Sequence, residues 1–439
     1  MAIARFGWIL LAIVSGSVEA QEIRGVVRDA ATGTPIPGVV VLALDSTSTM
    51  RSRVVANARG EYRVASASLV RTLRFVRIGF APEERVAPPT DTGSARLVVT
   101  MRAVSQLLAA LHVRANASCP KRADSDLAFS LWDQASAALL AAVVARETNP
   151  PQTVRVAYKR VLSRADRIEQ QLVQIDSTAV TARSFVAVLS SEDFARGGFS
   201  RDTSGMRHYL VPYADALLED EFLSRHCFRV VDGGATRRNQ VGVAFETARR
   251  ERRRVDVDGI VWVDTAARTL QRVEFHYVGV SIASEQARAG GEIWFRQMAN
   301  GLLVIDRWHI RGAGARERAV RDEFGELPLA EVPIVATQFG GEVVQATWPD
   351  GSNWHASLSR LTVRGVDASG NPVSGFEVRL RGTNYGARAN EQGVAELGDL
   401  LPGPYRAVVT VPSGGPLLHF EFTAQRDAVV DKRIRIAPP

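Results

Sequence analysis

The chain has 439 residues, a formal net charge of +7 and a hydrophobic fraction of 46%. At roughly 100–200 residues per domain, this length predicts two to four domains, and the apolar fraction excludes a chain that is disordered throughout. The small excess of positive charge is spread over the whole length and gives no argument for a nucleic-acid partner.

Residues 1–20 have the pattern of a secretory signal. Arg5 supplies positive charge, Phe6 to Val14 form a short apolar run, and Ala20 is a small residue at the expected cleavage site. The run is too short for a comfortable membrane span, and no later segment reaches about 18 uncharged apolar residues. We therefore expect an exported protein in the periplasm, at the outer-membrane periphery or outside the cell, with at most peripheral membrane contact.

Cys119 and Cys227 are the two cysteines of the chain. In an exported protein a single pair of cysteines most often forms a disulfide, so we expect these two to be bridged. Two separate buried thiols are the alternative. A metal site needs more soft ligands than two isolated cysteines, and the sequence predicts neither a metal nor a cofactor.

Residues 21–103 are predicted to form short strands separated by turns. Residues 23–28 alternate between apolar and polar, residues 29–38 are rich in glycine and proline, and residues 39–44 are continuously apolar. A continuous apolar run is typical of a strand that is buried on both faces. Such spacing indicates a small β-sandwich, whose expected core residues are Val27, Val39, Val41, Tyr62, Val64 and Phe75.

The segment from Ile23 to Val39 resembles the opening of carboxypeptidase regulatory-like domains. Two later landmarks, Asn57-x-x-Gly60-Glu-Tyr and Arg77-Ile-Gly-Phe, resemble the same family and follow in the same order. The resemblance implies a prealbumin-like β-sandwich, which is also called a carbohydrate-binding-like fold. Modules of this kind precede TonB-dependent receptors and many other envelope proteins.

Residues 104–151 are predicted to be a linker that contains one long helix over residues 124–147. Apolar residues recur in this segment at helical spacing, and alanine is frequent. Asp124 or Ser125 can cap the helix, and Asn149-Pro150-Pro151 ends it.

Residues 152–355 are predicted to form a β-rich middle domain. Strands are expected over residues 153–158, 260–264, 270–280, 291–297 and 302–310. The hairpin-like succession from Gly259 to Phe275 is similar to the curved antiparallel sheets of lipoprotein-carrier-like periplasmic domains.

Residues 356–439 repeat the pattern of residues 23–41. Leu361 to Val378 is followed by Asn390-Glu-Gln-Gly393 and by Pro402-Gly-Pro-Tyr405. This segment resembles a second regulatory-like sandwich or a collagen-adhesin B-type sandwich. Its expected core residues are Val363, Val366, Val378, Leu380, Leu397, Tyr405 and Val409. The fold class is therefore mainly β, with prealbumin-like or immunoglobulin-like sandwiches at both ends and the helix and β-rich domain between them.

Motifs of common hydrolases do not occur in the chain. None of the seven histidines begins a zinc-protease motif, and no serine lies in a Gly-x-Ser-x-Gly elbow. Asp256-Val-Asp258-Gly259 suggests calcium, but the further ligands of a calcium loop are missing, and we predict a hairpin turn at Asp258-Gly259 instead. These observations predict a protein that is not an enzyme.

Two groups of residues are candidates for ligand binding. Arg250, Arg252 and Arg253 belong to a basic run that could meet an anionic envelope surface, although a solvated strand edge explains the same run. Trp348, Trp354, Tyr385 and Tyr405 could stack on sugar rings, although aromatic residues of sandwiches more often lie in the core.

The sequence therefore predicts a non-enzymatic exported envelope protein that binds or scaffolds through its sandwich modules, with a glycan or an envelope protein as partner and no nucleic acid. The alternative is an envelope hydrolase or a lipid or ligand carrier whose site lies in the middle domain. A pocket with convergent Asp, His or Arg side chains would favour catalysis, whereas an apolar groove would favour binding.

Overall fold

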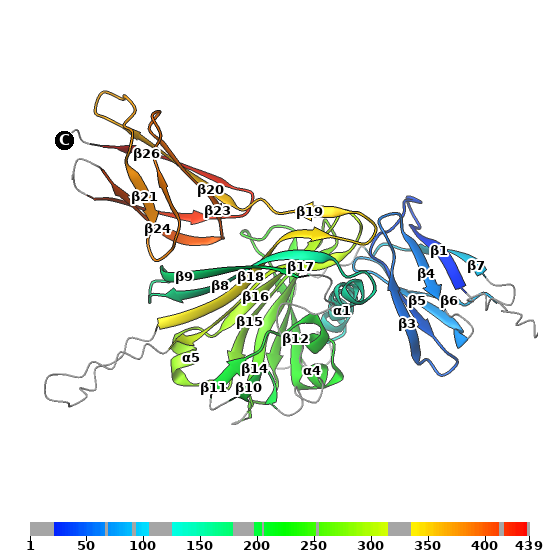
Figure 1. Cartoon of the computed structure of the whole chain (residues 1–439). Helices are drawn as coiled ribbons and strands as arrows, with labels where there is room; N and C mark the ends of the chain where they lie inside the picture. The colour runs from blue at the N-terminus through cyan, green and yellow to red at the C-terminus, as the bar shows by residue number, and fades with distance from the viewer. Residues whose placement is uncertain are drawn as a thin grey trace, which may run out of the picture.

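The fold is known from a computed structural model of the whole chain. The structure describes residues 22–65, 69–89, 94–104, 125–178, 197–203, 206–251, 254–314, 335–411 and 417–436. The chain is mainly β, and two sandwiches flank a large sheet in the middle, as predicted (Figure 1). The expected secretory signal lies outside the described residues.

The N-terminal sandwich consists of two sheets. The first has the order β4 (Glu61–Ala65), β1 (Glu22–Asp29) and β7 (Ser94–Met101). The second has the order β3 (Met50–Val55), β2 (Val40–Leu44), β5 (Thr72–Val76) and β6 (Glu83–Val86). All six predicted core residues are buried, so that prediction is confirmed.

The C-terminal sandwich repeats this topology strand for strand. One sheet has the order β23 (Val394–Leu400), β20 (Ser359–Val366) and β26 (Val429–Arg435). The other has the order β22 (Gly386–Arg388), β21 (Glu377–Leu380), β24 (Gly403–Thr410) and β25 (Leu418–Ala424). In both sandwiches the first strand pairs in parallel with the last, β1 with β7 and β20 with β26. The predicted core residues are buried, except for Val366, which is half-buried.

A single antiparallel sheet forms the middle of the molecule. Its order is β12 (His226–Asp232), β13 (Gln240–Thr247), β14 (Asp256–Asp264), β15 (Thr269–Val278), β16 (Gly290–Gln297), β17 (Leu303–Gly314), β18 (Val335–Thr347), β8 (Gln152–Leu162) and β9 (Ile168–Thr178). Strand β19 (Asn353–His355) pairs with β18. The remaining elements are the hairpin β10–β11 (Ser200–Thr203, Met206–Tyr209) and the short helices α3 (Ala214–Leu217), α4 (Asp220–Arg225) and α5 (Ile282–Gln286).

The long helix α1 (Ser125–Thr148) lies within one residue of its predicted bounds and is buried on two sides. Leu131, Trp132 and Leu139 pack on the middle sheet. Ala137 and Val144 pack against Val40 and Val76 of the N-terminal sandwich. A helix between two layers must be apolar on more than one face, which explains its alanine-rich sequence. It also explains why β2 is a continuous apolar run.

We call the side of the middle sheet that contacts α1 the inner face, and the opposite side the outer face. Phe245 and Phe275 are buried on the inner face, in the same core as α1. Side chains alternate between the two faces along each strand.

The predicted turn at Asp258-Gly259 is wrong. Both residues lie in the interior of β14, which runs without a break from Asp256 to Asp264. Gly259 is needed for packing, because an added Cβ would lie 2.5 Å from Cζ of the Phe245 ring. The true turn follows Asp264, whose carboxylate accepts hydrogen bonds from the backbone N–H groups of Ala266 and Ala267.

The C-terminal sandwich docks on the outer face of β8, β17 and β18. The Arg160 guanidinium donates to the Pro402 carbonyl oxygen at 2.8 Å and to the Tyr405 hydroxyl at 3.2 Å. Arg426 contacts Asp306 at 2.8 Å and Glu342 at 2.7 Å, and both carboxylates are buried. Buried ion pairs of this kind fix the relative position of two packed bodies, because moving them apart would leave a charge without its partner.

Candidate functional site

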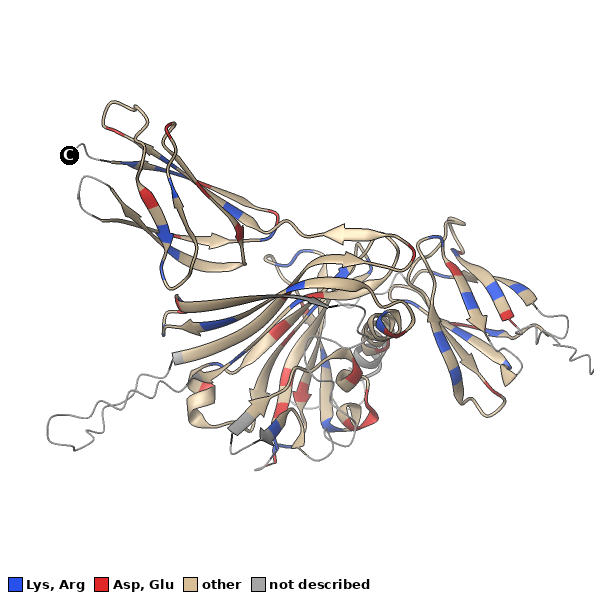
Figure 2. Ribbon diagram, in the orientation of Figure 1, with Lys and Arg blue, Asp and Glu red and all other residues tan. Residues whose placement is uncertain are grey.

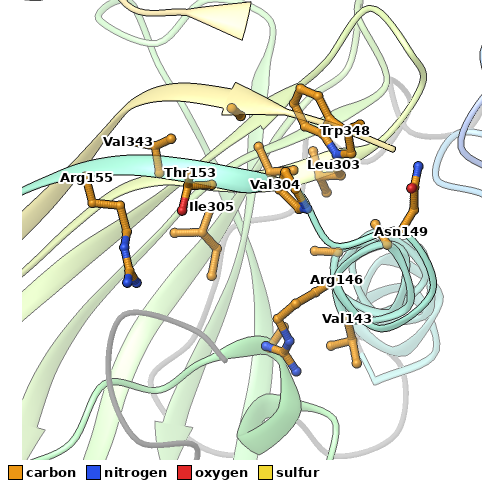
Figure 3. Close-up of a pocket in the computed structure, with 15 residues that line it drawn as sticks. Val143, Arg146, Asn149, Thr153, Arg155, Leu303, Val304, Ile305, Val343 and Trp348 are labelled. Atoms are coloured by element: carbon orange, nitrogen blue, oxygen red, sulfur yellow. The ribbon is translucent and has the colours of Figure 1, made fainter. Parts of the chain in front are cut away.

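A cavity of about 100 Å³ lies between the C-terminal half of α1 and the inner face of β8, β17 and β18 (Figure 3). Its wall is mainly aliphatic, with Val143 of the helix opposite Leu303 and Ile305 of β17 and Val343 of β18. Trp348 closes one end.

Small side chains create this cavity. Ala142 and Ala145 line it from the helix, and Ala346 lines it from β18. Where helix and sheet meet through alanine, the facing side chains leave a space that larger residues would fill. The same composition that makes α1 a good helix therefore also makes room beside it.

Trp348 lines the cavity and carries a buried hydrogen-bond donor that has no partner among the described residues. The residue is 3% exposed, and its indole Nε1 has no hydrogen-bond partner within the described part of the chain. An unpaired buried donor costs about 1–3 kcal/mol, so a ligand with an acceptor oxygen at this point would recover that energy.

The other end of the cavity is polar. Arg146 forms a bidentate ion pair with Asp215, with N–O distances of 2.8 and 3.1 Å. Arg155 of β8 also lines the cavity (Figure 3). Tyr213 belongs to the same region, where burial raises the pKa of its hydroxyl, although Arg146 and Arg155 act in the opposite direction. The cavity thus combines an aliphatic wall with polar groups at both ends.

The aromatic residues predicted to stack on sugars lie in two separate places. Trp348 and Trp354 belong to one apolar cluster beside the middle sheet, and Tyr385 and Tyr405 to the core of the C-terminal sandwich. The Trp354 ring lies under Arg296 and Arg426, at 5.1 and 5.6 Å from its centroid. The structure therefore does not assemble the four rings into one exposed platform.

Of the three candidate arginines, Arg250 is exposed and lies 4.0 Å from Asp258, whereas Arg252 and Arg253 lie outside the described residues. Cys227 is half-buried in β12, and Cys119 lies outside the described residues, so their bridge remains a prediction.

Sequence reasoning identified one residue of the cavity, Trp348, and assigned it a different role. The cavity depends on which helical alanines face which strands, and that pairing joins residues about 200 positions apart. The useful signal in the sequence was the length of the alanine-rich helix before a β-rich domain.

No helix among the described residues has both the length and the apolar character required to cross a membrane. Within the same residues, no three His, Cys, Asp or Glu side chains are grouped so that they could hold a metal ion.

Comparison with known structures yields distant matches. BcpA, the major pilin subunit of Bacillus cereus, has 10% sequence identity and a TM-score of 0.16, with 95% of this chain and 99% of that chain covered. A putative membrane-associated protein of unknown function from Bacteroides fragilis has 9% identity and a TM-score of 0.16, with 74% and 95% covered. The full-length RrgB pilus protein from Streptococcus pneumoniae has 8% identity and a TM-score of 0.16, with 94% and 68% covered. Scores this low support no conclusion about this chain.

Among curated proteins, none matches the chain. The family model of the carboxypeptidase regulatory-like domain matches residues 22–102. That segment coincides with the N-terminal sandwich and confirms the resemblance of its opening strand and turns. The N-terminal sandwich is thus a carboxypeptidase regulatory-like domain, a regulatory rather than a catalytic type of module.

Proposed function

We propose that the chain is an exported binding protein that holds a small amphiphilic ligand in the cavity between α1 and the middle sheet. The observation that carries this proposal is the buried, unpaired N–H of Trp348, a residue that lines a mainly aliphatic cavity. Ligand sites in proteins are typically apolar with a few placed polar groups, and this cavity has that composition.

The size of the cavity limits the ligand. A cavity of about 150 Å³ with apolar walls can hold benzene. The space of about 100 Å³ beside α1 is smaller, so it can enclose only a few carbon atoms of a short alkyl chain and not a whole lipid. Such a chain would place its aliphatic part against Val143 and Leu303. An oxygen atom of the ligand would accept a hydrogen bond from the Trp348 N–H.

The architecture around the cavity supports a binding role. A single antiparallel sheet with a helix on its inner face agrees with the resemblance to carrier-like periplasmic domains. The two sandwiches lie on either side of this sheet (Figure 1). Among the residues that the structure describes, neither sandwich contributes to the lining of the cavity. In this proposal they position the carrier body in the cell envelope through contacts with an envelope protein or a glycan.

Calorimetric titration with hexanoate tests the proposal. The protein is expected to bind hexanoate, and Trp348→Phe is expected to weaken binding about tenfold, because phenylalanine keeps one aromatic ring but lacks the five-membered ring that carries the indole N–H. Ala142→Leu places extra methyl groups in the cavity and should abolish binding while leaving the protein folded.

Ala157→Leu is the matched control, since Ala157 follows Thr153 and Arg155 on the same face of β8 but does not line the cavity. The proposal would be contradicted if the wild type and Ala142→Leu bound hexanoate with equal affinity, or if Trp348→Phe bound hexanoate as tightly as the wild type.

A further inference from the structure

The outer face of the middle sheet carries a second hollow, on the side opposite to the apolar cavity. This groove has a volume of about 680 Å³ and extends over β12 to β17. Acidic, basic and histidine side chains line it beside apolar ones, and Figure 2 shows acidic and basic residues close together along the middle sheet.

The register of the strands places three titratable groups side by side on the groove floor. Glu274 of β15 lies directly opposite Glu292 of β16, and Glu292 lies directly opposite His309 of β17. Residues that face each other in this way have Cβ atoms about 4.5–5.5 Å apart. The row is therefore continuous across three neighbouring strands.

Glu274 is held in place by other side chains. Arg237 and Arg272 each contact its carboxylate at 2.8 Å, and the Trp262 indole donates to it at 2.9 Å. These donors fix the position of the Glu274 carboxylate.

Glu292 and His309 differ from Glu274, because neither forms a hydrogen bond or an ion pair within the described part of the chain. Burial and the neighbouring Glu274 raise the pKa of Glu292, and burial lowers the pKa of His309 to about 4. A neutral imidazole and a carboxyl group that lack a hydrogen-bond partner among the described residues are available on the groove floor to accept hydrogen bonds from a ligand or to donate them to it.

The charge of the groove restricts the class of ligand. Four arginines and four carboxylates line it, together with two histidines, so the charges balance. A strongly charged ligand gains little from a balanced lining, whereas a ligand with many hydroxyl groups can donate to carboxylates and accept from guanidinium groups at once.

We propose that this groove is a binding site for a neutral oligosaccharide, with Glu292 and His309 as its central contacts. The volume is within the range of small-ligand sites, which is about 300–1,000 Å³. The site is separate from the apolar cavity and does not depend on it, because the two lie on opposite faces of the sheet.

Fluorescence titration with labelled oligosaccharides tests the site. The probes are a neutral set of gluco-, manno- and galacto-tetrasaccharides and an anionic tetragalacturonate. At least one neutral probe should bind, and Glu292→Gln should weaken that binding at least tenfold. His309→Gln should act in the same direction and replaces the first variant if Glu292→Gln fails to fold.

Glu396→Gln is the control, because Glu396 is an exposed glutamate on β23 of the C-terminal sandwich. Hexanoate titration of Glu292→Gln should give the wild-type affinity, which separates this site from the cavity beside α1. The proposal is overturned if no neutral probe binds, if tetragalacturonate binds more tightly than every neutral probe, or if the groove variants bind as well as Glu396→Gln.

Discussion

At the residue scale, Glu342 joins the middle sheet to the C-terminal sandwich. Burial raises the pKa of Glu342 from 4.5 to about 6, although the Arg426 guanidinium lies 2.7 Å away and acts in the opposite direction. Because the folded state binds this proton more tightly, the stability that it contributes is complete below pH 4.5 and is lost as the pH rises through about 6.

Glu342→Gln tests this assignment, because glutamine imitates the protonated acid at every pH. The free energy of unfolding of the wild type, minus that of Glu342→Gln, should fall as the pH rises from 4.5 to above 6 and stay constant below this window. Urea unfolding at intervals between pH 4 and 8 measures this difference. His309 is present in both proteins, so its own effect on stability, which rises with pH, is removed by the subtraction. A difference that increases with pH would show that the Arg426 ion pair outweighs the cost of burial.

At the scale of single elements, Gly259 shows how β14 is adapted to its neighbours. An alanine Cβ at this position would lie 2.2 Å from the Glu274 carbonyl oxygen and 2.5 Å from the Phe245 ring. Gly259→Ala should therefore lower the free energy of unfolding by about 1–3 kcal/mol in urea titration, as overpacked positions do.

Gly398 of β23 provides the control, since an added Cβ there meets no atom within 4 Å. Gly398→Ala should change the free energy of unfolding by no more than about 0.5 kcal/mol. Equal effects of the two substitutions would contradict the packing that we describe around Gly259.

These elements also show what the sequence can and cannot predict. The apolar run of β2 and the alanine-rich helix α1 could be predicted, because periodicity and composition are local properties. The conformation of Asp258-Gly259 could not be predicted, because the same dipeptide fits a turn or a strand that packs beneath a phenylalanine of the neighbouring strand. The cavity beside α1 depends on contacts between residues that are far apart in the sequence. The row from Glu274 to His309 depends on the register of neighbouring strands, which the pattern of residues alone does not reveal.

At the scale of the whole molecule, Arg426 holds the C-terminal sandwich on the middle sheet. Its side chain is 6% exposed and contacts Asp306 and Glu342. Arg426→Ala leaves two buried carboxylates without this partner and should cost about 3–5 kcal/mol. Small-angle scattering should show a larger radius of gyration if the sandwich separates from the sheet.

Arg381→Ala is the comparison, because Arg381 is 57% exposed and lies 4.0 Å from Glu169. A pair of this kind contributes about 0–1 kcal/mol. If Arg426→Ala and Arg381→Ala behave alike, the buried ion pairs do not fix the C-terminal sandwich.

The central claim is that the cavity between α1 and the middle sheet binds a short amphiphile. A crystal structure of the protein with 6-bromohexanoate tests it most directly, because bromine gives an anomalous signal that locates the alkyl end. We predict a single strong bromine peak beside Val143 and Leu303, with the carboxylate within hydrogen-bond distance of Trp348 Nε1. Bromine found only at the surface, with the cavity unchanged, would contradict the claim.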